Sequence, residues 1–252
     1  MFKVIPSKFI PTSILVVDDN QWFLDVLSLF MEDSRKVKSF ISTVEAFSFL
    51  ERHSQLSLNP VFNSTLELPN LQSHERFVNY ISTIICDYDM PIEHGLEFFG
   101  KIISLPRPYQ KILLTGMMQK SKGYEALEDN TIDHFLLKDD LMVNTESLSE
   151  LIYCCECRLH QKFFDMHDEF PILAQEFYVN LINGIIKDNN IVEGYLLNSN
   201  GDYLVIDSGG SIQKVVFKSD ISLASSPGNL DYQLLKEELD GIFSYNSFLR
   251  EV

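Results

Sequence analysis

Acidic, hydroxyl and amine side chains stand at the ends of short apolar runs in this chain. Asp18 and Asp19 follow the run Ile14–Val17, and Asp87 ends the run that begins at Ile84. Clustered carboxylates of this kind bind a hard divalent cation such as Mg²⁺, which accepts phosphate oxygens as further ligands. A carboxylate can also act as the nucleophile and form an aspartyl phosphate. The chemistry that these residues indicate is phosphoryl transfer.

Two further runs end in groups that suit the same chemistry. Thr115 ends the run Lys111–Thr115, and Lys138 ends the run His134–Lys138. A hydroxyl and an ammonium can stabilise the oxygens of a phosphoryl group during its transfer. We therefore expect Thr115 and Lys138 to assist a reaction at Asp87.

These residues must be brought together by the elements that carry them. The apolar runs predict five buried parallel strands that alternate with helices. The strands are expected at 14–18, 37–41, 84–87, 111–115 and 134–138, and the helices at 21–31, 43–50, 95–103, 122–128 and from 147 onward. Such alternation indicates a doubly wound parallel sheet, in which ligands bind beyond the carboxyl ends of the strands.

With these elements in order, the chain resembles the receiver domain of two-component response regulators. The matching segments are Ile14-Leu-Val-Val-Asp-Asp19, Ile85-Cys-Asp-Tyr-Asp-Met-Pro91 followed by Gly95-Leu96-Glu97, Ile112-Leu-Leu-Thr-Gly116 and Phe135-Leu-Leu-Lys138. The resemblance implies a flavodoxin-like five-stranded sheet, with phosphorelay signalling and no enzymatic activity beyond phosphorylation and dephosphorylation of the receiver aspartate.

The resemblance also implies a role for each matching residue. Asp87 is the expected phosphoacceptor and a ligand of Mg²⁺, together with Asp18, Asp19 and the backbone carbonyl of Asp89. Thr115 and Phe135 are the expected switch positions, and Lys138 is the expected phosphate-sensing lysine. The expected phosphoryl donor is a histidine kinase or a phosphotransfer protein. One departure is Asp139, which stands where receivers usually have a proline after the lysine.

Three parts make up the predicted organisation of the chain. Residues 1–12 are expected to form an N-terminal arm, residues 13–160 the receiver with an insertion at about 55–79, and residues 165–252 an output or interaction domain. A long helix, about 147–163, is expected near the boundary. Strands at 191–197, 203–207 and 212–218, with turns at Asn200-Gly201 and Gly209-Gly210, predict a smaller α+β module with a β-meander, closed by a helix near 230–242.

The composition indicates which classes of partner the protein could bind. The net charge is −16, and residues 163–252 hold 5 Lys or Arg against 14 Asp or Glu. Phosphate backbones repel such a surface, so we expect no DNA binding and a downstream protein target instead. No apolar run approaches the length of a membrane span. With no recognisable signal peptide and four cysteines that cannot form a secreted disulfide framework, a cytoplasmic location is expected.

Several alternatives stay open. An Mg²⁺-dependent phosphatase of the haloacid dehalogenase type would use Asp87-Tyr88-Asp89 as its nucleophile motif, although it would place its acidic pair last. A receiver that is never phosphorylated would serve as a docking platform. Asp19 could cap the helix that starts at Gln21, and Phe135 could be a plain core aromatic. The cysteines at 154, 155 and 157 fit small buried thiols better than a metal site.

Overall fold

The computed structural model describes residues 2–31, 36–54, 80–106, 108–116, 120–143, 145–165, 167–217 and 232–236. The predicted insertion at 55–79 lies outside these residues. The described chain divides into two compact units. One runs from Thr12 to Glu156, and the other combines Met1–Pro11 with the chain from Cys157 onward.

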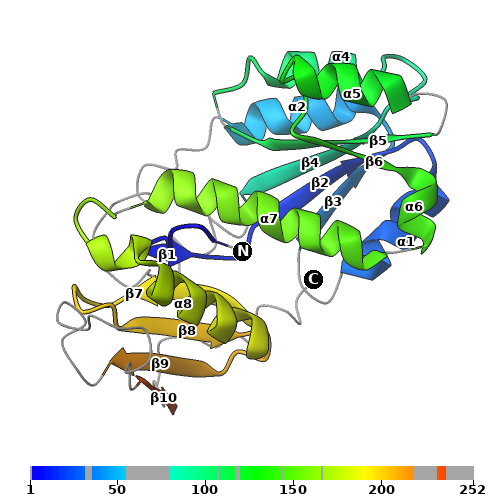
Figure 1. The fold of residues 1–252 in the computed structure, drawn as a ribbon. Coiled ribbons are helices and arrows are strands. Elements are labelled where there is room, and N and C mark those ends of the chain that lie inside the picture. The colour runs from blue at the N-terminus through cyan, green and yellow to red at the C-terminus, as the bar shows by residue number, and fades with distance from the viewer. Residues whose placement is uncertain are drawn as a thin grey trace. The chain divides into compact units, whose positions relative to one another are not determined.

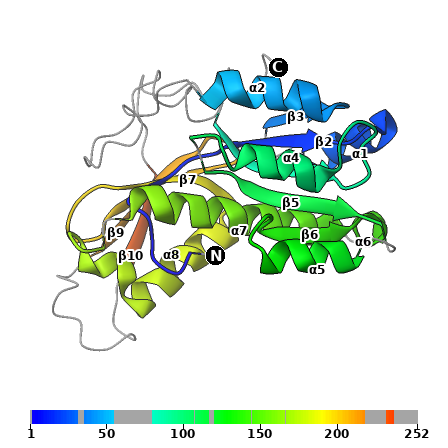
Figure 2. The same cartoon turned by 90° about the horizontal axis from the view of Figure 1, so that it is seen from above.

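The first unit is built on a parallel sheet of five strands in the order β3-β2-β4-β5-β6. The strands are β2 (Ser13–Val17), β3 (Lys36–Phe40), β4 (Ile81–Asp87), β5 (Gln110–Thr115) and β6 (His134–Leu137). Every residue of β2 and β4 is buried, as expected for central strands with helices on both faces. Figure 2 shows the strands running in one direction. The predicted flavodoxin-like sheet is confirmed.

Helices cover both faces of this sheet (Figure 1). On one face lie α2 (Thr43–Ser54), α4 (Gly95–Ile102) and α5 (Lys120–Glu128), which share a core with β4 and β5. On the other face lie α1 (Gln21–Met31) and α7 (Thr145–Phe164), whose core includes Ile85 and Ile112. The short helix α6 (Lys138–Val143) follows β6 directly.

Helix α1 carries two sets of apolar side chains at helical spacing. Trp22, Val26, Leu29 and Phe30 stand at helical spacing, yet Trp22, Leu29 and Phe30 are exposed. The buried residues are Phe23, Leu24, Leu27 and Met31. Both sets have helical spacing, so the periodicity establishes a helix without deciding which stripe faces the sheet.

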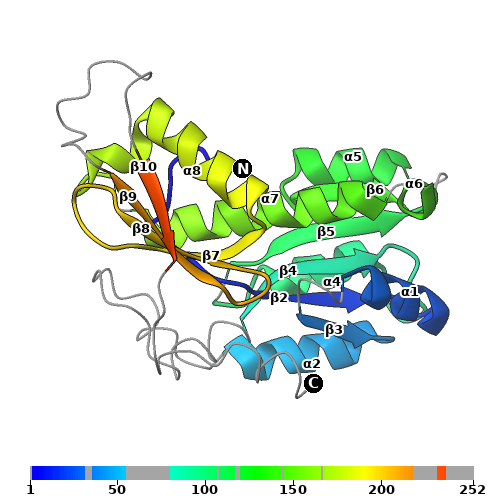
Figure 3. The ribbon, with the colours of Figure 1, turned by 90° about the horizontal axis from the view of Figure 1, so that it is seen from below.

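The second unit contains an antiparallel sheet in the order β1-β7-β8-β9-β10. Its strands are β1 (Lys8–Phe9), β7 (Ile191–Leu196), β8 (Tyr203–Asp207), β9 (Ile212–Phe217) and β10 (Tyr232–Lys236). Figure 3 shows β8, β9 and β10 side by side. The predicted β-meander is confirmed, whereas the helix expected near 230–242 is wrong at 232–236, where Tyr232–Lys236 pairs with β9. The backbone of this segment is instead paired antiparallel with β9.

The N-terminal segment belongs to this second unit. Lys8 and Phe9 pair with Tyr195 and Gly194, so the predicted N-terminal arm supplies an edge strand. The hydroxyl of Tyr203 donates to the carbonyl of Pro6 at 2.6 Å. The side chain of Asn183 on α8 (Glu176–Asp188) bonds both backbone groups of Phe2. A 3₁₀ turn at Pro171–Ala174 precedes α8.

Candidate functional site

The register of the parallel strands brings the predicted site residues to one edge of the sheet. Val17 lies opposite Cys86, so Asp18 and Asp87 emerge at the same level on neighbouring strands. Thr115 lies opposite Leu137, the residue before Lys138. This edge is the carboxyl end of all four strands, where a doubly wound sheet binds its ligands.

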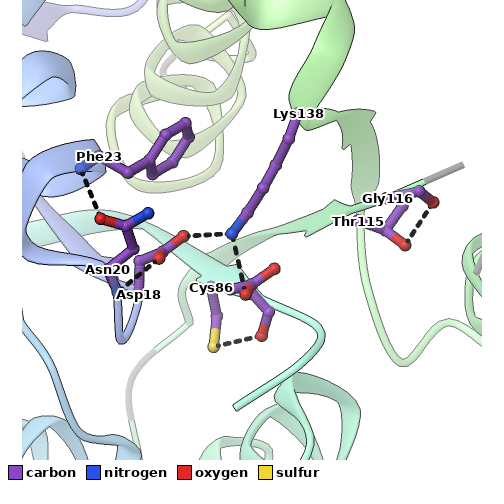
Figure 4. Close-up of polar contacts among 8 residues, drawn as sticks. Asp18, Asn20, Phe23, Cys86, Thr115, Gly116 and Lys138 are labelled. Carbon is purple, nitrogen blue, oxygen red and sulfur yellow. Dashed lines mark hydrogen bonds and ion pairs between the residues drawn. The ribbon is translucent and has the colours of Figure 1, made fainter.

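Lys138 connects the two central carboxylates (Figure 4). Its Nζ lies 2.7 Å from Oδ2 of Asp18 and 2.9 Å from Oδ2 of Asp87. Asp18 is fully buried and Asp87 nearly so, while about a quarter of the Lys138 side chain is exposed. Two carboxylates with low exposure would repel each other strongly without a cation between them. The ammonium of Lys138 lies between them and fills that role.

The ionisation of Asp87 and Lys138 follows from this geometry. Burial raises the pKa of Asp87 above its ordinary value, although the hydrogen bond and charge of Lys138 oppose the rise. For Lys138, burial alone would lower the pKa, but its hydrogen bonds to Asp18 and Asp87 outweigh this and raise it. Lys138 is therefore a full cation at neutral pH.

Asp18, Asp19 and Asp87 form a group that can hold a metal ion. One carboxylate oxygen from each lies within 4.8 Å of the others. Asp18 and Asp87 are buried, whereas Asp19 is exposed. Hard oxygen donors, one of them open to water, match the preference of Mg²⁺ for carboxylates and retained waters. These residues fit a magnesium ion.

The backbone around Asp87 is closely packed. The amide of Tyr88 donates to the carbonyl of Leu114 at 2.8 Å, and the amide of Gly95 donates to the carbonyl of Tyr88 at 3.0 Å. The rings of Tyr88 and His94 stack with centroids 5.1 Å apart. Cys86 donates its thiol hydrogen to the carbonyl of Asp87 at 3.2 Å, and burial raises the pKa of that thiol, which keeps it neutral. These contacts fix the backbone on both sides of Asp87.

Thr115 and Phe135, the predicted switch positions, lie on adjacent strands. Thr115 is fully buried, and its hydroxyl donates to the carbonyl of Gly116 at 3.2 Å. Figure 4 shows this hydroxyl directed at Gly116, away from Lys138. Phe135 is partly buried, with its ring against Gly123 and edge-on to Tyr124 at 4.9 Å between centroids.

Two residues near the site were not singled out from the sequence. Asn20 caps α1, because its side-chain oxygen accepts from the amide of Phe23 at 3.3 Å; Asp19, the cap considered above, is not the residue used. The ring of Phe23 lies 4.9 Å from Nζ of Lys138. Asparagine directly before the first helical residue was the available signal for the cap. No sequence pattern signals the aromatic contact, since it joins residues 115 positions apart.

The first unit has a doubly wound, flavodoxin-like fold with acidic and basic side chains at one edge of its sheet, and a second unit follows it. No protein-family model matches the chain, and no curated protein matches it. Among solved structures, the response regulator LqsR of Legionella pneumophila is similar over 100% of this chain and 97% of its own, with 22% identity and a TM-score of 0.74.

Two receiver structures are similar over part of the chain. A response regulator receiver domain protein from Clostridium thermocellum has 21% identity and a TM-score of 0.44, covering 58% of this chain and 95% of its own. A CheY-like receiver domain protein from Methanospirillum hungatei has 20% identity and a TM-score of 0.44, covering 60% and 98%. At such identities the similarity to LqsR establishes the fold of both units, and function rests on the residues.

Proposed function

We propose that this protein is a response regulator that accepts a phosphoryl group on Asp87 in a phosphorelay. The observation that carries the proposal is the position of Lys138, whose ammonium lies within 3 Å of both Asp18 and Asp87. One ammonium and two carboxylates from three strand ends thereby meet at the edge where a doubly wound sheet binds its ligands.

The reaction follows from these groups. A carboxylate oxygen of Asp87 attacks the phosphorus of the donor and forms a new P–O bond. The bond from phosphorus to the donor's leaving atom breaks, and its electron pair departs with the leaving group. Lys138 is placed to bind an oxygen of the transferred group, because its Nζ is already 2.9 Å from Asp87. Thr115 would bind another oxygen after its hydroxyl turns from the carbonyl of Gly116.

A magnesium ion would be held by Asp18, Asp19 and Asp87, with the backbone carbonyl of Asp89 as a further ligand. When bound, it would neutralise charge on the phosphoryl oxygens. The ion and the ammonium of Lys138 would bind the same two carboxylates, Asp18 and Asp87. The positive charge that faces these carboxylates would therefore depend on whether the ion is bound.

The phosphatase alternative is not favoured. A haloacid dehalogenase-type enzyme would need a late acidic pair near the nucleophile, and the pair that directly follows Lys138, Asp139 and Asp140, is exposed at the start of α6. The acids that neighbour Asp87 come instead from the end of β2, which lies beside β4 in the sheet.

The second unit is the proposed output module, and we propose a protein as its target. Its acidic composition opposes phosphate backbones. A strand stands at Tyr232–Lys236, where a helix was expected. An edge of the antiparallel sheet is therefore the surface that could add a partner strand. No helix among the described residues is long and apolar enough to cross a membrane.

Intact-protein mass spectrometry after incubation with acetyl phosphate and Mg²⁺ tests the phosphoacceptor. The wild type should gain the mass of one phosphoryl group, and Asp87→Asn should gain none. Asp25→Asn, an exposed aspartate on α1, is the matched control and should behave as the wild type. A phosphoryl group on Asp87→Asn would remove Asp87 from the role, and no gain on the wild type would contradict the proposed function.

A further inference from the structure

We infer that Phe23 is a positioning residue for Lys138, and that the face of its ring holds the lysine ammonium beside Asp87. This inference rests on the proposed function and assigns a role to a residue outside the set of acids, hydroxyl and lysine. Nζ of Lys138 lies 4.9 Å from the centroid of the Phe23 ring. A cation within about 6 Å of an aromatic face is attracted to the negative potential of that face.

The contact belongs to a closed circuit of four residues, which Figure 4 shows together. Oδ1 of Asp18 accepts from the amide of Asn20 at 3.0 Å, and Oδ1 of Asn20 accepts from the amide of Phe23 at 3.3 Å. The ring of Phe23 meets Lys138, and Lys138 returns to Oδ2 of Asp18 at 2.7 Å. The start of α1 is thus fixed to the acid that pairs with the lysine.

Lysine needs such a restraint. Its flexible stem carries about 2 kcal/mol of rotamer entropy, and its strongly hydrated ammonium favours water. More than a quarter of the Lys138 side chain is exposed, so a path to solvent is open. Phe23 itself is 5% exposed, which fixes its ring in the core formed with Leu24 and Leu27.

The two carboxylates alone are an insufficient restraint, because they are also the proposed ligands of the cation. Oδ2 of Asp18 and Oδ2 of Asp87 both pair with the ammonium. A hard cation prefers oxygen donors, and an aromatic face offers none. The ring is therefore the one partner of Lys138 in this circuit for which a metal ion does not compete.

The alternative is that Phe23 serves only as core packing. Phe23→Leu keeps an apolar side chain and removes the ring, while Phe99→Leu makes the same change at a fully buried position on α4. Both variants should lose comparable stability by urea denaturation. Graded fluorination of the ring at position 23 keeps the shape and weakens the negative face, so it separates electrostatics from packing if Phe23→Leu folds poorly.

Two measurements on the full chain decide between these roles. In metal-free protein, the ring current of Phe23 should shift the NMR signals of the Lys138 ε-methylene, and Phe23→Leu should abolish this shift while Phe99→Leu keeps it. With saturating Mg²⁺ and acetyl phosphate, the maximal rate of Asp87 phosphorylation should fall about 3- to 10-fold in Phe23→Leu, as expected for one lost cation–π contact. The rate should fall stepwise with fluorination, and Mg²⁺ affinity should change less than about twofold.

The outcomes are distinguishable. A wild type that is phosphorylated, with Phe23→Leu and the fluorinated forms within about twofold of its rate, would overturn the positioning role. An unshifted ε-methylene signal in the wild type would overturn it as well. A wild type that gains no phosphoryl group while the ε-methylene shift is present would instead contradict the proposed function, since the contact would exist without the reaction.

Discussion

A side chain at position 95 would overlap the backbone carbonyl of Asp87. A Cβ on Gly95 would lie well inside contact distance of that oxygen, and 3.1 Å from the Cδ1 of Leu113. The first residue of α4 therefore packs directly on the backbone of the proposed phosphoacceptor. Glycine is required here by close approach, because only a residue without a Cβ leaves room for the carbonyl.

Gly95→Ala should displace the Asp87 backbone and lower both stability and phosphorylation. Overpacking of this kind costs about 1–3 kcal/mol in free energy of unfolding. Gly100→Ala on the same helix is the matched control, because a Cβ there meets no atom within 4 Å. It should raise stability by about 0.5–1 kcal/mol. Urea denaturation and acetyl phosphate labelling measure both effects, and equal behaviour of the two variants would contradict the packing argument.

Removing one acid of the Asp18, Asp19 and Asp87 group should weaken Mg²⁺ binding. Loss of a residue that only hydrogen-bonds a metal ligand already lowers metal affinity about 10- to 100-fold. Loss of a ligand itself, in Asp18→Asn or Asp19→Asn, should lower the affinity at least as much. Titration followed by calorimetry, or by fluorescence of Trp22, the only tryptophan, reports the affinity. Asp25→Asn controls for charge on α1. Unchanged affinity in both site variants would exclude these acids as ligands.

The raised pKa of Asp87 predicts how stability depends on pH in metal-free protein. Burial disfavours the carboxylate, so the folded protein binds more protons than the unfolded chain between the ordinary pKa of 3.8 and the raised value. The free energy of unfolding therefore falls as pH rises through that window, and the deficit persists at neutral pH. Asp87→Asn should be more stable than the wild type at pH 7, with a difference that shrinks below pH 3.8. Denaturation at several pH values with a chelator would refute this if Asp87→Asn were the less stable protein at pH 7.

Deletion of residues 1–11 should unfold the second unit and leave the first unit folded. Those residues supply β1, and Phe9 is buried with its ring 6.3 Å from that of Tyr203. The point variant Phe9→Ala should cost about 3–5 kcal/mol, whereas the exposed Lys3→Ala should change little. Hydrogen exchange of β7 and β8, compared with β2 and β4, reports each unit separately. Full protection of β7 after the deletion would contradict a structural role for the segment.

The second unit should not bind DNA. Duplex binding draws on cations that face phosphates, and residues 163–252 carry 5 Lys or Arg against 14 Asp or Glu. Fluorescence anisotropy with random duplex at low salt, before and after acetyl phosphate treatment, should show no binding at micromolar protein. Tighter binding that weakens steeply with added salt would overturn the assignment of a protein target.

The sequence was most informative where an apolar run ends in an acidic, hydroxyl or amine side chain. Buried apolar runs closed by Asp18, Asp87, Thr115 and Lys138 predicted both the sheet and the edge at which these residues meet. It was least informative where tertiary contacts choose between equivalent patterns. Helix α1 offers two apolar stripes, and only packing on the sheet selects Phe23 and its neighbours. The roles of the site residues remain predictions until phosphorylation is measured.

Strand β1 escaped prediction for a related reason. Two residues, Lys8 and Phe9, show no periodicity, and their pairing with β7 spans most of the chain. The segment 232–236 is a strand because β9 offers an edge, although its composition also suits a helix. Long-range pairing of this kind leaves no local signal, since the partner strand supplies the hydrogen bonds.

The second unit is built from two separate segments of the chain, which limits how chimeras of this protein can be made. Because the described residues up to Pro11 and those from Cys157 onward belong to one unit, the first unit is an insertion within the second, and a chimera must be joined at two seams instead of one. The residues at those seams touch, since the hydroxyl of Thr12 donates to Oε1 of Glu156 at 2.8 Å. Another domain of the same fold could replace the first unit wherever its own ends lie equally close, and a graft at the C-terminal seam alone would leave the antiparallel sheet without its first strand.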